Sequence, residues 1–590
     1  MILGCAAACS AATVDIHPGQ DIPTIVAQNP AGTTFVIYPG TYRLTAHIVP
    51  KTGDSFIGQT SCAPPKTACT AILTGARVIG NLAKLNGGVY EVTGQTQQGT
   101  VSLPNKVCET GYMACNLPED LFFDDVPYQH LSASSLPTIG SKQWWFNYSN
   151  NTIYFHDNPS GHTVETSVLD SAFQSSANNV TVKYLTIKDF AAPLQRGGIE
   201  PTNGNPSTSS SANWVISNCD IYNNHGAGVR FAYGTKVYNS YVHDNGSLGI
   251  MGGTGSSTAS GVVIQGNTIN HNNYARVNPA AGAGGFKVGY TAGVVLKGNS
   301  INDNNGPGIH FDSTSQNPVV DGNVITGNGD GAGVSWEISI AGALVRNNII
   351  LKNGIPMGNP GSVAGIGSYA SVGEQSYCNV IEIPNAAGAN GFLIVGSDRG
   401  YNAVSPYEYL MSTGNSVHHN TVIWDAGAVG ITGYWLSDAS HQPNFFSNNT
   451  APDYNQYHLP SLSTANFIYD HNSSGANSRK TFSEYQAAGA DIHGSADNKN
   501  TSGYPTVSIS APADGTSFTA SSMTVQATAA DASGINRVEF YVDWTKKATV
   551  TGSSPSYNWT SIPTGKHVVT AMAYSNAGIR NCYAVTVTKN

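Results

Sequence analysis

The hydrophobic positions between Gly293 and Lys352 follow one short repeat. Each copy holds two or three aliphatic residues, a small residue, an asparagine, an aliphatic pair, an asparagine-rich turn, and a glycine that precedes alternating apolar and polar positions. Asn299, Asn323 and Asn348 mark the same point of successive copies, 24 and 25 residues apart. Short strands joined by Asn/Gly turns at such a period predict a parallel β-helix, in which each copy forms one coil and the stacked coils bury a continuous core.

The same frame extends toward the N-terminus. Copies resume after Ala172, where Asn218, Asn239 and Asn267 are expected to continue an inward stack of asparagines, because turn amides can bond the neighbouring backbone. An amphipathic segment around Ile22–Val26 is expected to form a helix that covers the open end of the first coil.

Two stretches break the repeat. Residues 75–170 read as longer alternating strands with hairpin turns, which predict an inserted antiparallel β subdomain. From residue 505 to 590, about seven short strands with turn signals roughly every 8–12 residues predict an immunoglobulin-like β-sandwich. We therefore expect an all-β protein with a parallel β-helix catalytic domain over residues 13–500, an insert at about 75–170, and a sandwich over 505–590.

Composition narrows the class of function. The net charge of the 590-residue chain is −9 and no basic block occurs, so nucleic acid is not an expected partner. No apolar run reaches about 18 residues, so no membrane span is expected. We expect a monomer, with a polysaccharide or oligosaccharide as its partner and no cofactor.

Residues 1–12 resemble the remnant of a secretory signal peptide, because they are apolar and rich in small residues. The alternative is a lipoprotein anchor at Leu3-Gly4-Cys5, although the charged and apolar regions that would precede it are missing. The expectation is a secreted protein, extracellular or periplasmic.

The cysteines agree with an oxidising compartment. Cys62 with Cys69, and Cys108 with Cys115, are each seven residues apart in loops, which suggests two local disulfides; a zinc site is the alternative. The scattered Cys219, Cys378 and Cys582 are expected to be buried thiols.

The alternating segments of two successive copies place two acids on one face. In the run from Gly308 to Asp312 the apolar residues point inward, so Asp312 points outward, and the run from Gly333 to Glu337 places Glu337 outward in the next coil. Coils are about 4.8 Å apart, so the two carboxyl groups should lie about 5–6 Å apart. That separation suits double-displacement glycoside hydrolysis.

Other outward positions of consecutive coils hold further candidates for substrate binding. They are Arg230, Met251, Lys287, His310 and Ser335. Arg230 could instead pair with Asp220 or Asp244. Trp336 could help to desolvate Glu337, and further aromatic candidates for stacking against sugar are Tyr290, Tyr369, Tyr434 and Trp435.

Several motifs resemble known families. The turn Pro39-Gly40-Thr41-Tyr42 resembles the opening of pectate-lyase-like right-handed β-helix proteins. GGFK, GPGIHFD and GAGVSWEIS, preceded by DLFFDDVPYQHL, resemble right-handed β-helix glycoside hydrolases of families 120 and 141 over about residues 60–400. This resemblance implies hydrolysis of β-xylosides or related hemicellulose glycosides, with Asp312 as nucleophile and Glu337 as acid/base. The C-terminal motifs SAPADG, VEFYVD and PTGKHVVTAMAY resemble bacterial Ig-like modules of secreted glycan-active enzymes.

Three other functions stay open. A polysaccharide lyase would use Lys287 as base, Arg230 to neutralise a uronate, and often Ca²⁺, but Asp303, Asp321 and Asp330 are dispersed and form no compact Ca²⁺ cluster, so no metal is expected. An inverting hydrolase resembling polygalacturonase-like β-helices would usually need several aspartates around one cleft, whereas this face offers one Asp and one Glu. A non-catalytic glycan-binding or adhesin solenoid would bind without turnover.

Overall fold

The computed structural model describes residues 12–85, 87–202, 211–253, 259–354, 363–397, 411–440, 442–469, 478–499 and 503–590. The expected signal-peptide remnant, apart from Ala12, lies outside the described residues. The chain forms two compact units, the first Met1–Val295 with Asn299–Pro307 and the second Leu296–Gly298 with Gly308–Asn590. Within the described ranges, no helix has the length and apolar character that crossing a membrane requires.

In the first unit, three parallel sheets line the coils, which we call sheets A, B and C. Sheet A contains β1 (Thr13–Ile16), β2 (Thr34–Ile37), β4 (Ser55–Gly58), β16 (Thr181–Lys183), β19 (Val215–Ser217), β22 (Lys236–Tyr238) and β26 (Val263–Gln265). Sheet B contains β3 (Gly40–Arg43), β5 (Ala71–Thr74), β17 (Thr186–Lys188), β20 (Asp220–Tyr222), β23 (Tyr241–His243), β27 (Thr268–Asn270) and β31 (Ser300–Asn302). Sheet C contains β15 (Phe173–Gln174), β18 (Gly197–Glu200), β21 (Ala227–Phe231), β24 (Leu248–Gly252) and β28 (Gly284–Gly289).

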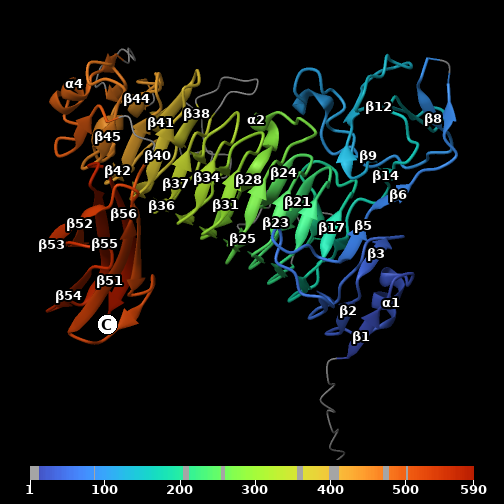
Figure 1. The fold of residues 1–590 in the computed structure, drawn as a ribbon, viewed down its shortest axis with the longest axis horizontal. Helices are drawn as coiled ribbons and strands as arrows, with labels where there is room; N and C mark the ends of the chain where they lie inside the picture. The colour runs from blue at the N-terminus through green and yellow to red at the C-terminus, as the bar shows by residue number, and fades with distance from the viewer. Residues whose placement is uncertain are drawn as a thin grey trace, which may run out of the picture. The chain divides into compact units, whose positions relative to one another are not determined.

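Sheets of the same three kinds line the second unit. Sheet A contains β33 (Val319–Asp321), β36 (Leu344–Arg346), β39 (Gln375–Tyr377) and β42 (Ser416–His418). Sheet B contains β34 (Val324–Thr326), β37 (Ile349–Leu351), β40 (Val380–Ile383), β43 (Thr421–Trp424), β45 (Gln456–His458) and β48 (Ser495–Asp497), and Figure 1 shows β34, β37 and β40 side by side. Sheet C contains β32 (Ile309–Asp312), β35 (Val334–Glu337), β38 (Val363–Tyr369), β41 (Ala389–Gly396), β44 (Thr432–Leu436) and β46 (Phe467–Tyr469), with β47 (Arg479–Lys480) paired antiparallel to β46.

Short elements complete the coils. They are β25 (Ala259–Ser260), which pairs with β29 (Thr291–Ala292), the helices α2 (Pro279–Gly282), α3 (Phe445–Asn448) and α4 (Phe482–Ala487), and β30 (Val295–Lys297) at the division between the units. The inward residues stack in register: Val182, Ile216, Val237 and Ile264 follow one another along sheet A and are all fully buried. The alternation in the sequence therefore predicts the core correctly.

Helix α1 (Ile22–Gln28) buries Ile22 and Val26, as the amphipathic pattern predicts. Its first turn is capped by Asp21, whose carboxylate accepts a hydrogen bond from the Thr24 backbone amide at 3.1 Å.

Asparagine side chains bond from coil to coil in two rows. In the row after sheet A, the amide of Asn267 donates to Asn299 at 3.0 Å, and that of Asn323 donates to Asn348 at 3.0 Å. A second row, which the sequence analysis did not single out, follows sheet B, and its links include Asn224 to Asn245 and Asn328 to Asn353. These amides satisfy buried polar groups and fix the register of each coil on the next.

The expectation that Asn218 and Asn239 belong to the first row is wrong. Both have left-handed backbones, with φ of 52° and 48°, and the row passes through the residues that follow them, Cys219 and Ser240. Asparagine is common at left-handed turn positions, so here its presence reflects backbone conformation instead of stacking.

The insert consists of two small β-sheets. One contains β10 (Val126–Pro127), β9 (Leu121–Phe123), β14 (Val164–Ser167) and β6 (Ala76–Val78), and the other contains β11 (Gln129–His130), β12 (Gln143–Asn147), β13 (Thr152–Phe155), β8 (Tyr90–Val92) and β7 (Ala83–Lys84), with a 3₁₀ turn at Asn105–Val107. All pairs are antiparallel except β11 with β12. Trp144, Phe146 and Phe155 are buried in its core, as expected for an antiparallel subdomain.

The C-terminal domain is a sandwich of two sheets. One contains β49 (Thr506–Ala511), β51 (Ser522–Ala530) and β54 (Ser556–Thr560), and the other contains β50 (Ser517–Phe518), β56 (Arg580–Lys589), β55 (Gly565–Ser575), β52 (Ile535–Val542) and β53 (Thr545–Val550). Phe540 and Trp559 pack between the sheets.

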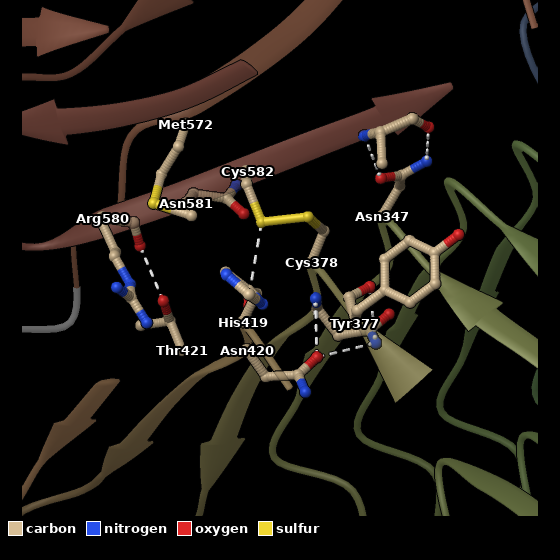
Figure 2. Close-up of a disulfide and its surroundings, with 12 residues drawn as sticks. Asn347, Tyr377, Cys378, His419, Asn420, Thr421, Met572, Arg580, Asn581 and Cys582 are labelled. Atoms are coloured by element: carbon tan, nitrogen blue, oxygen red, sulfur yellow. Dashed lines mark hydrogen bonds between the residues drawn. A yellow bond between two sulfur atoms is a disulfide. The ribbon is translucent and has the colours of Figure 1, made fainter. Parts of the chain in front are cut away.

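A disulfide joins this sandwich to the coils, and this corrects the expectation of buried thiols at Cys378 and Cys582. Their sulfur atoms are bonded across 204 residues, and Figure 2 shows the bond between the coil and β56. Tyr377 and Met572 are buried beside it. Spacing could not reveal this pair, whereas Cys62–Cys69 and Cys108–Cys115 form the local disulfides that spacing predicts and Cys219 is a buried thiol.

Polar contacts extend the same interface. The Asn347 side chain exchanges two hydrogen bonds with the backbone of Ala584, at 2.8 and 2.9 Å, in the manner of a β-strand partner (Figure 2). Arg346, 2% exposed, binds Asp321 on the preceding coil and Asp514 of the sandwich, at 3.2 and 2.7 Å. The sandwich is therefore fixed on the coils that precede it.

Replacing Cys378 and Cys582 together by alanine should lower the free energy of unfolding by about 5 kcal/mol, because the bond closes a loop of 204 residues. The matched control is the Cys62/Cys69 double alanine variant, whose short loop gives about 2 kcal/mol by the same entropy argument. Chemical denaturation under oxidising conditions measures both, and a smaller loss for the long loop would contradict the entropic account.

Candidate active site

Asp312 and Glu337 end two neighbouring strands of sheet C in the second unit. Strand β32 pairs with β35 in parallel, with Ile309 opposite Val334 and Phe311 opposite Trp336. Ile309, Val334 and Phe311 are buried at 0–1% exposure, whereas the terminal acids are half-buried. The register therefore places one carboxyl group from each coil on the outer face, as the alternation predicts.

Three side chains meet at this point. One ligand atom each from His310, Asp312 and Glu337 lies within 4.8 Å of the other two, so the carboxyl groups approach as closely as expected. The His310 Nε2 atom lies 2.9 Å from Glu337 Oε2. His310 is 7% exposed, and its Nδ1 atom has no hydrogen-bond partner among the described residues. The histidine is therefore held in one orientation mainly by Glu337.

Asp312 is oriented by the turn that follows it. The backbone amide and the hydroxyl of Ser313 both donate to Asp312 Oδ1, at 2.7 and 3.1 Å. Ser313 and Thr314 have left-handed backbones, so the strand ends abruptly after the acid. This turn fixes the direction in which the carboxylate points.

Tyr369 lies next to Glu337 on the following coil, where β38 pairs with β35. The Tyr369 hydroxyl lies directly over Gly367. A Cβ atom at residue 367 would be only 2.5 Å from the hydroxyl oxygen, so the glycine leaves room for the ring. Burial raises the pKa of Tyr369 well above its usual value, and the carboxylates of Glu337 and Glu374 raise it further. Tyr369 is thus a neutral, half-buried side chain beside the acid pair.

The row continues from Tyr369 to Val395 and Trp435 on the next two coils. Tyr369 and Trp435 pack against an apolar cluster of Ala364, Leu393, Val395, Ile431 and Ile468. The outer face of sheet C therefore changes from polar to apolar on one side of the acids.

Two aromatic candidates must be corrected. Trp336 is 1% exposed and packs edge to face against Phe311 inside the coils, with ring centroids 5.7 Å apart, so it does not reach a ligand on the outer face. Tyr434 is fully buried and donates to the Thr450 carbonyl at 2.8 Å. Both occupy inward positions of the alternation, where large rings fill the core.

Ser335 lies opposite His310 in the second unit and is buried. The remaining candidates lie in the first unit. Arg230 pairs with Met251, and Met251 with Lys287, along sheet C as expected. Lys287 and the following Tyr290 are half-buried, and their role in substrate binding stays a prediction.

Arg230 has neither of the expected acidic partners. It lies 3.7 Å from the buried Glu200 and donates to the carbonyls of Gln195 and Gly253, while Asp220 and Asp244 both bind His243. With 6% exposure and these bonds, its guanidinium is already engaged by the protein.

Two groups of side chains in the described ranges have metal-ligand geometry. His310, Asp312 and Glu337 form the first, but three ligand atoms fall short of the six or more oxygens that Ca²⁺ takes. The second consists of Asp125, Glu165 and Asp189, whose carboxyl groups are already paired with cations. Lys188 contacts both aspartates, and Arg43 contacts Glu165.

Glu374 is an ionisable residue that the sequence analysis missed. It is fully buried and lies before β39, and neither of its carboxyl oxygens has a hydrogen-bond partner of normal geometry in the described part of the chain. Burial raises its pKa to about 7, with the nearby Ser368 hydroxyl opposing the shift. A turn position carries no periodicity that would reveal such a residue.

Known families match parts of the chain. The right-handed β-helix region matches residues 207–382, and the bacterial Ig domain matches residues 505–571. No curated protein matches. These matches and the structure confirm the expected right-handed β-helix with a bacterial Ig-like domain.

Solved structures are similar in fold. XylC, solved in complex with xylose, is 14% identical and aligns over 97% of this chain and 100% of its own, with a TM-score of 0.59. The A-module of the mannuronan C-5 epimerase AlgE6 of Azotobacter vinelandii is 14% identical over 81% of this chain and 94% of its own, with a TM-score of 0.44. At 14% identity, the likeness to XylC shows the fold alone.

The Glu374→Gln variant should be more stable than the wild type near pH 8 and equally stable near pH 4. Between about pH 4.5 and 7 the folded chain keeps a proton that the unfolded chain releases, so the stability of the wild type falls as the pH rises. The difference should reach roughly 3 kcal/mol, measured as denaturation midpoints across pH. Parallel pH profiles of the two proteins would contradict the assignment.

Proposed function

We propose that this protein is a retaining glycoside hydrolase in which Asp312 is the nucleophile and Glu337 the acid/base. The observation that carries the proposal is the approach of the two carboxyl groups, whose nearest oxygens lie within 4.8 Å on adjacent strands. Retaining enzymes hold their carboxyl groups about 5–5.5 Å apart, whereas inverting enzymes keep about 6.5–9.5 Å for a water molecule.

In the first step, the Asp312 carboxylate attacks the anomeric carbon while Glu337 donates its proton to the leaving glycosidic oxygen, which forms a glycosyl-enzyme. In the second step, Glu337 removes a proton from water, which attacks the same carbon and releases Asp312. Glu337 recovers its proton in this step, so each residue returns to its starting state.

His310 acts as a positioning residue in this scheme. Its bond to Glu337 Oε2 selects one orientation of the carboxyl group, and the two bonds from Ser313 do the same for Asp312. A fixed geometry is what a bond-making carboxylate pair requires. Tyr369, beside Glu337, is placed to contact the sugar that is bound there.

The favoured substrate is a β-xyloside-like unit of plant or microbial polysaccharide. The fold likeness to XylC, which was solved with xylose, supports this choice. A lyase has less support, because Arg230, which would have to neutralise a uronate, is buried and engaged by Glu200. Three disulfides support secretion into an oxidising compartment.

Asp312→Asn and Glu337→Gln should separate the two roles. On a natural xyloside, we expect kcat/KM to fall about 10⁴-fold or more for Asp312→Asn and roughly 10²–10⁴-fold for Glu337→Gln. On an aryl glycoside whose phenol leaves without protonation, only Asp312→Asn should remain severely impaired in the first step. Azide should rescue Glu337→Gln and give a glycosyl azide of retained configuration.

The exposed turn residue Asp303 provides the matched control, and Asp303→Asn should keep the wild-type rate. An inverted product anomer in the NMR spectrum, or wild-type turnover by Asp312→Asn, would contradict the proposal.

A further inference from the structure

A second candidate site lies within the first unit, between the insert and two turns of the coils. It is a cavity of about 310 Å³, which we call the insert pocket. Its walls include Tyr112, Asp120, His130 and Lys142 from the insert and His225 and Tyr274 from the turns that precede strands of sheet C. None of these side chains takes part in the chemistry proposed for Asp312 and Glu337.

A buried network forms one wall of the insert pocket. The Asp120 Oδ2 atom receives a hydrogen bond from the Tyr274 hydroxyl at 2.6 Å and lies 3.0 Å from His225 Nδ1. The other ring nitrogen, His225 Nε2, donates to the Cys115 carbonyl at 2.9 Å. Both of these contacts of the carboxylate fall on Oδ2, so Oδ1 is left to accept a further bond.

His225 carries the charge that balances Asp120. Burial would lower the pKa of His225, but the adjacent Asp120 carboxylate and the Cys115 carbonyl raise it above its usual value. The side chains of His225 and Asp120 are 2% and 4% exposed. The pair is therefore close to neutral overall, and Lys142 is an exposed cation at the edge.

His130 forms another part of the wall and, unlike His225, is uncharged and has no hydrogen-bond partner of normal geometry in the described part of the chain. Its ring stacks on Trp144 with centroids 3.9 Å apart. Burial and the charge of His225 lower the pKa of His130 to about 3, although the Glu119 backbone opposes this shift. The ring is neutral at ordinary pH and holds one donor and one acceptor, both buried in the wall of the cavity.

We propose that the insert pocket binds one neutral monosaccharide unit. A hydroxyl group both donates and accepts, so a polyhydroxylated ligand matches the two nitrogens of His130 and the free acceptor Asp120 Oδ1 together. The rings of Tyr112 and Tyr128 add apolar surface, as small-molecule sites do. The size of the cavity suits a single small ligand.

Other occupants fit less well. An anion would meet the carboxylate of Asp120, and only Lys142 at the edge would attract it. A metal ion would find His225 already bonded at both nitrogens, and no metal-ligand group occurs here among the described residues. The proposal does not depend on which reaction Asp312 and Glu337 carry out.

The test uses the full chain with Glu337→Gln, which suppresses turnover, and titrates D-xylose, L-arabinose, D-glucose and D-galactose by calorimetry. D-galacturonate, which differs from D-galactose by a carboxylate, is titrated as the anionic comparison. His130→Phe in this background keeps the ring that stacks on Trp144 but removes both nitrogens. Lys142→Ala removes the cation at the edge.

We expect at least one neutral sugar to bind, His130→Phe to weaken that binding by about tenfold or more, and Lys142→Ala to change it little. The melting temperature of His130→Phe should equal or exceed that of its parent, because two buried orphan atoms are lost. This control separates loss of binding from loss of fold.

Three results would overturn the proposal. The first is that none of the four neutral sugars shows saturable binding. The second is that His130→Phe binds sugar as tightly as its parent, which would mean that the cavity holds only water. The third is that galacturonate binds more tightly than galactose and that Lys142→Ala loses this binding.

Discussion

The register between neighbouring coils is the constraint on which the candidate chemistry depends. Each coil is held on the next by backbone pairing and by asparagine amides that bond the equivalent residue one coil away. A slip of one residue in one coil would turn every outward side chain of that strand inward. Asp312 and Glu337 meet only because Phe311 stays opposite Trp336 in the core. The apolar interior therefore positions the polar exterior.

The sequence predicts most of the scaffold because its periodicities are local. Alternation with period two assigns inward and outward faces. It places Asp312 and Glu337 on the outer face and Trp336 in the core, as the structure does. Isolated turn residues have no such periodicity. Asn218 could be mistaken for a stacked asparagine because both roles favour the same residue.

Contacts between distant residues could not be predicted. Nothing in the spacing links Cys378 to Cys582, and nothing links Arg230 to Glu200, since each partner comes from a different coil or domain. The insert pocket is a further case, because Asp120 and His225 are 105 residues apart. Glu374 could not be predicted for another reason, because a single buried acid in a turn belongs to no repeating pattern. Such residues are found by burial and by their missing partners, which only coordinates supply.

The bond between the coils and the sandwich changes what cleavage of the chain would do. The peptide that connects the two parts runs near residue 503, well before Cys582, and the disulfide crosses the interface independently of it. A protease that cut this connection would yield two polypeptides that still travel as one molecule until a reductant acts. After such a cut, the C-terminal domain would stay covalently attached through the disulfide and would not need an intact linker.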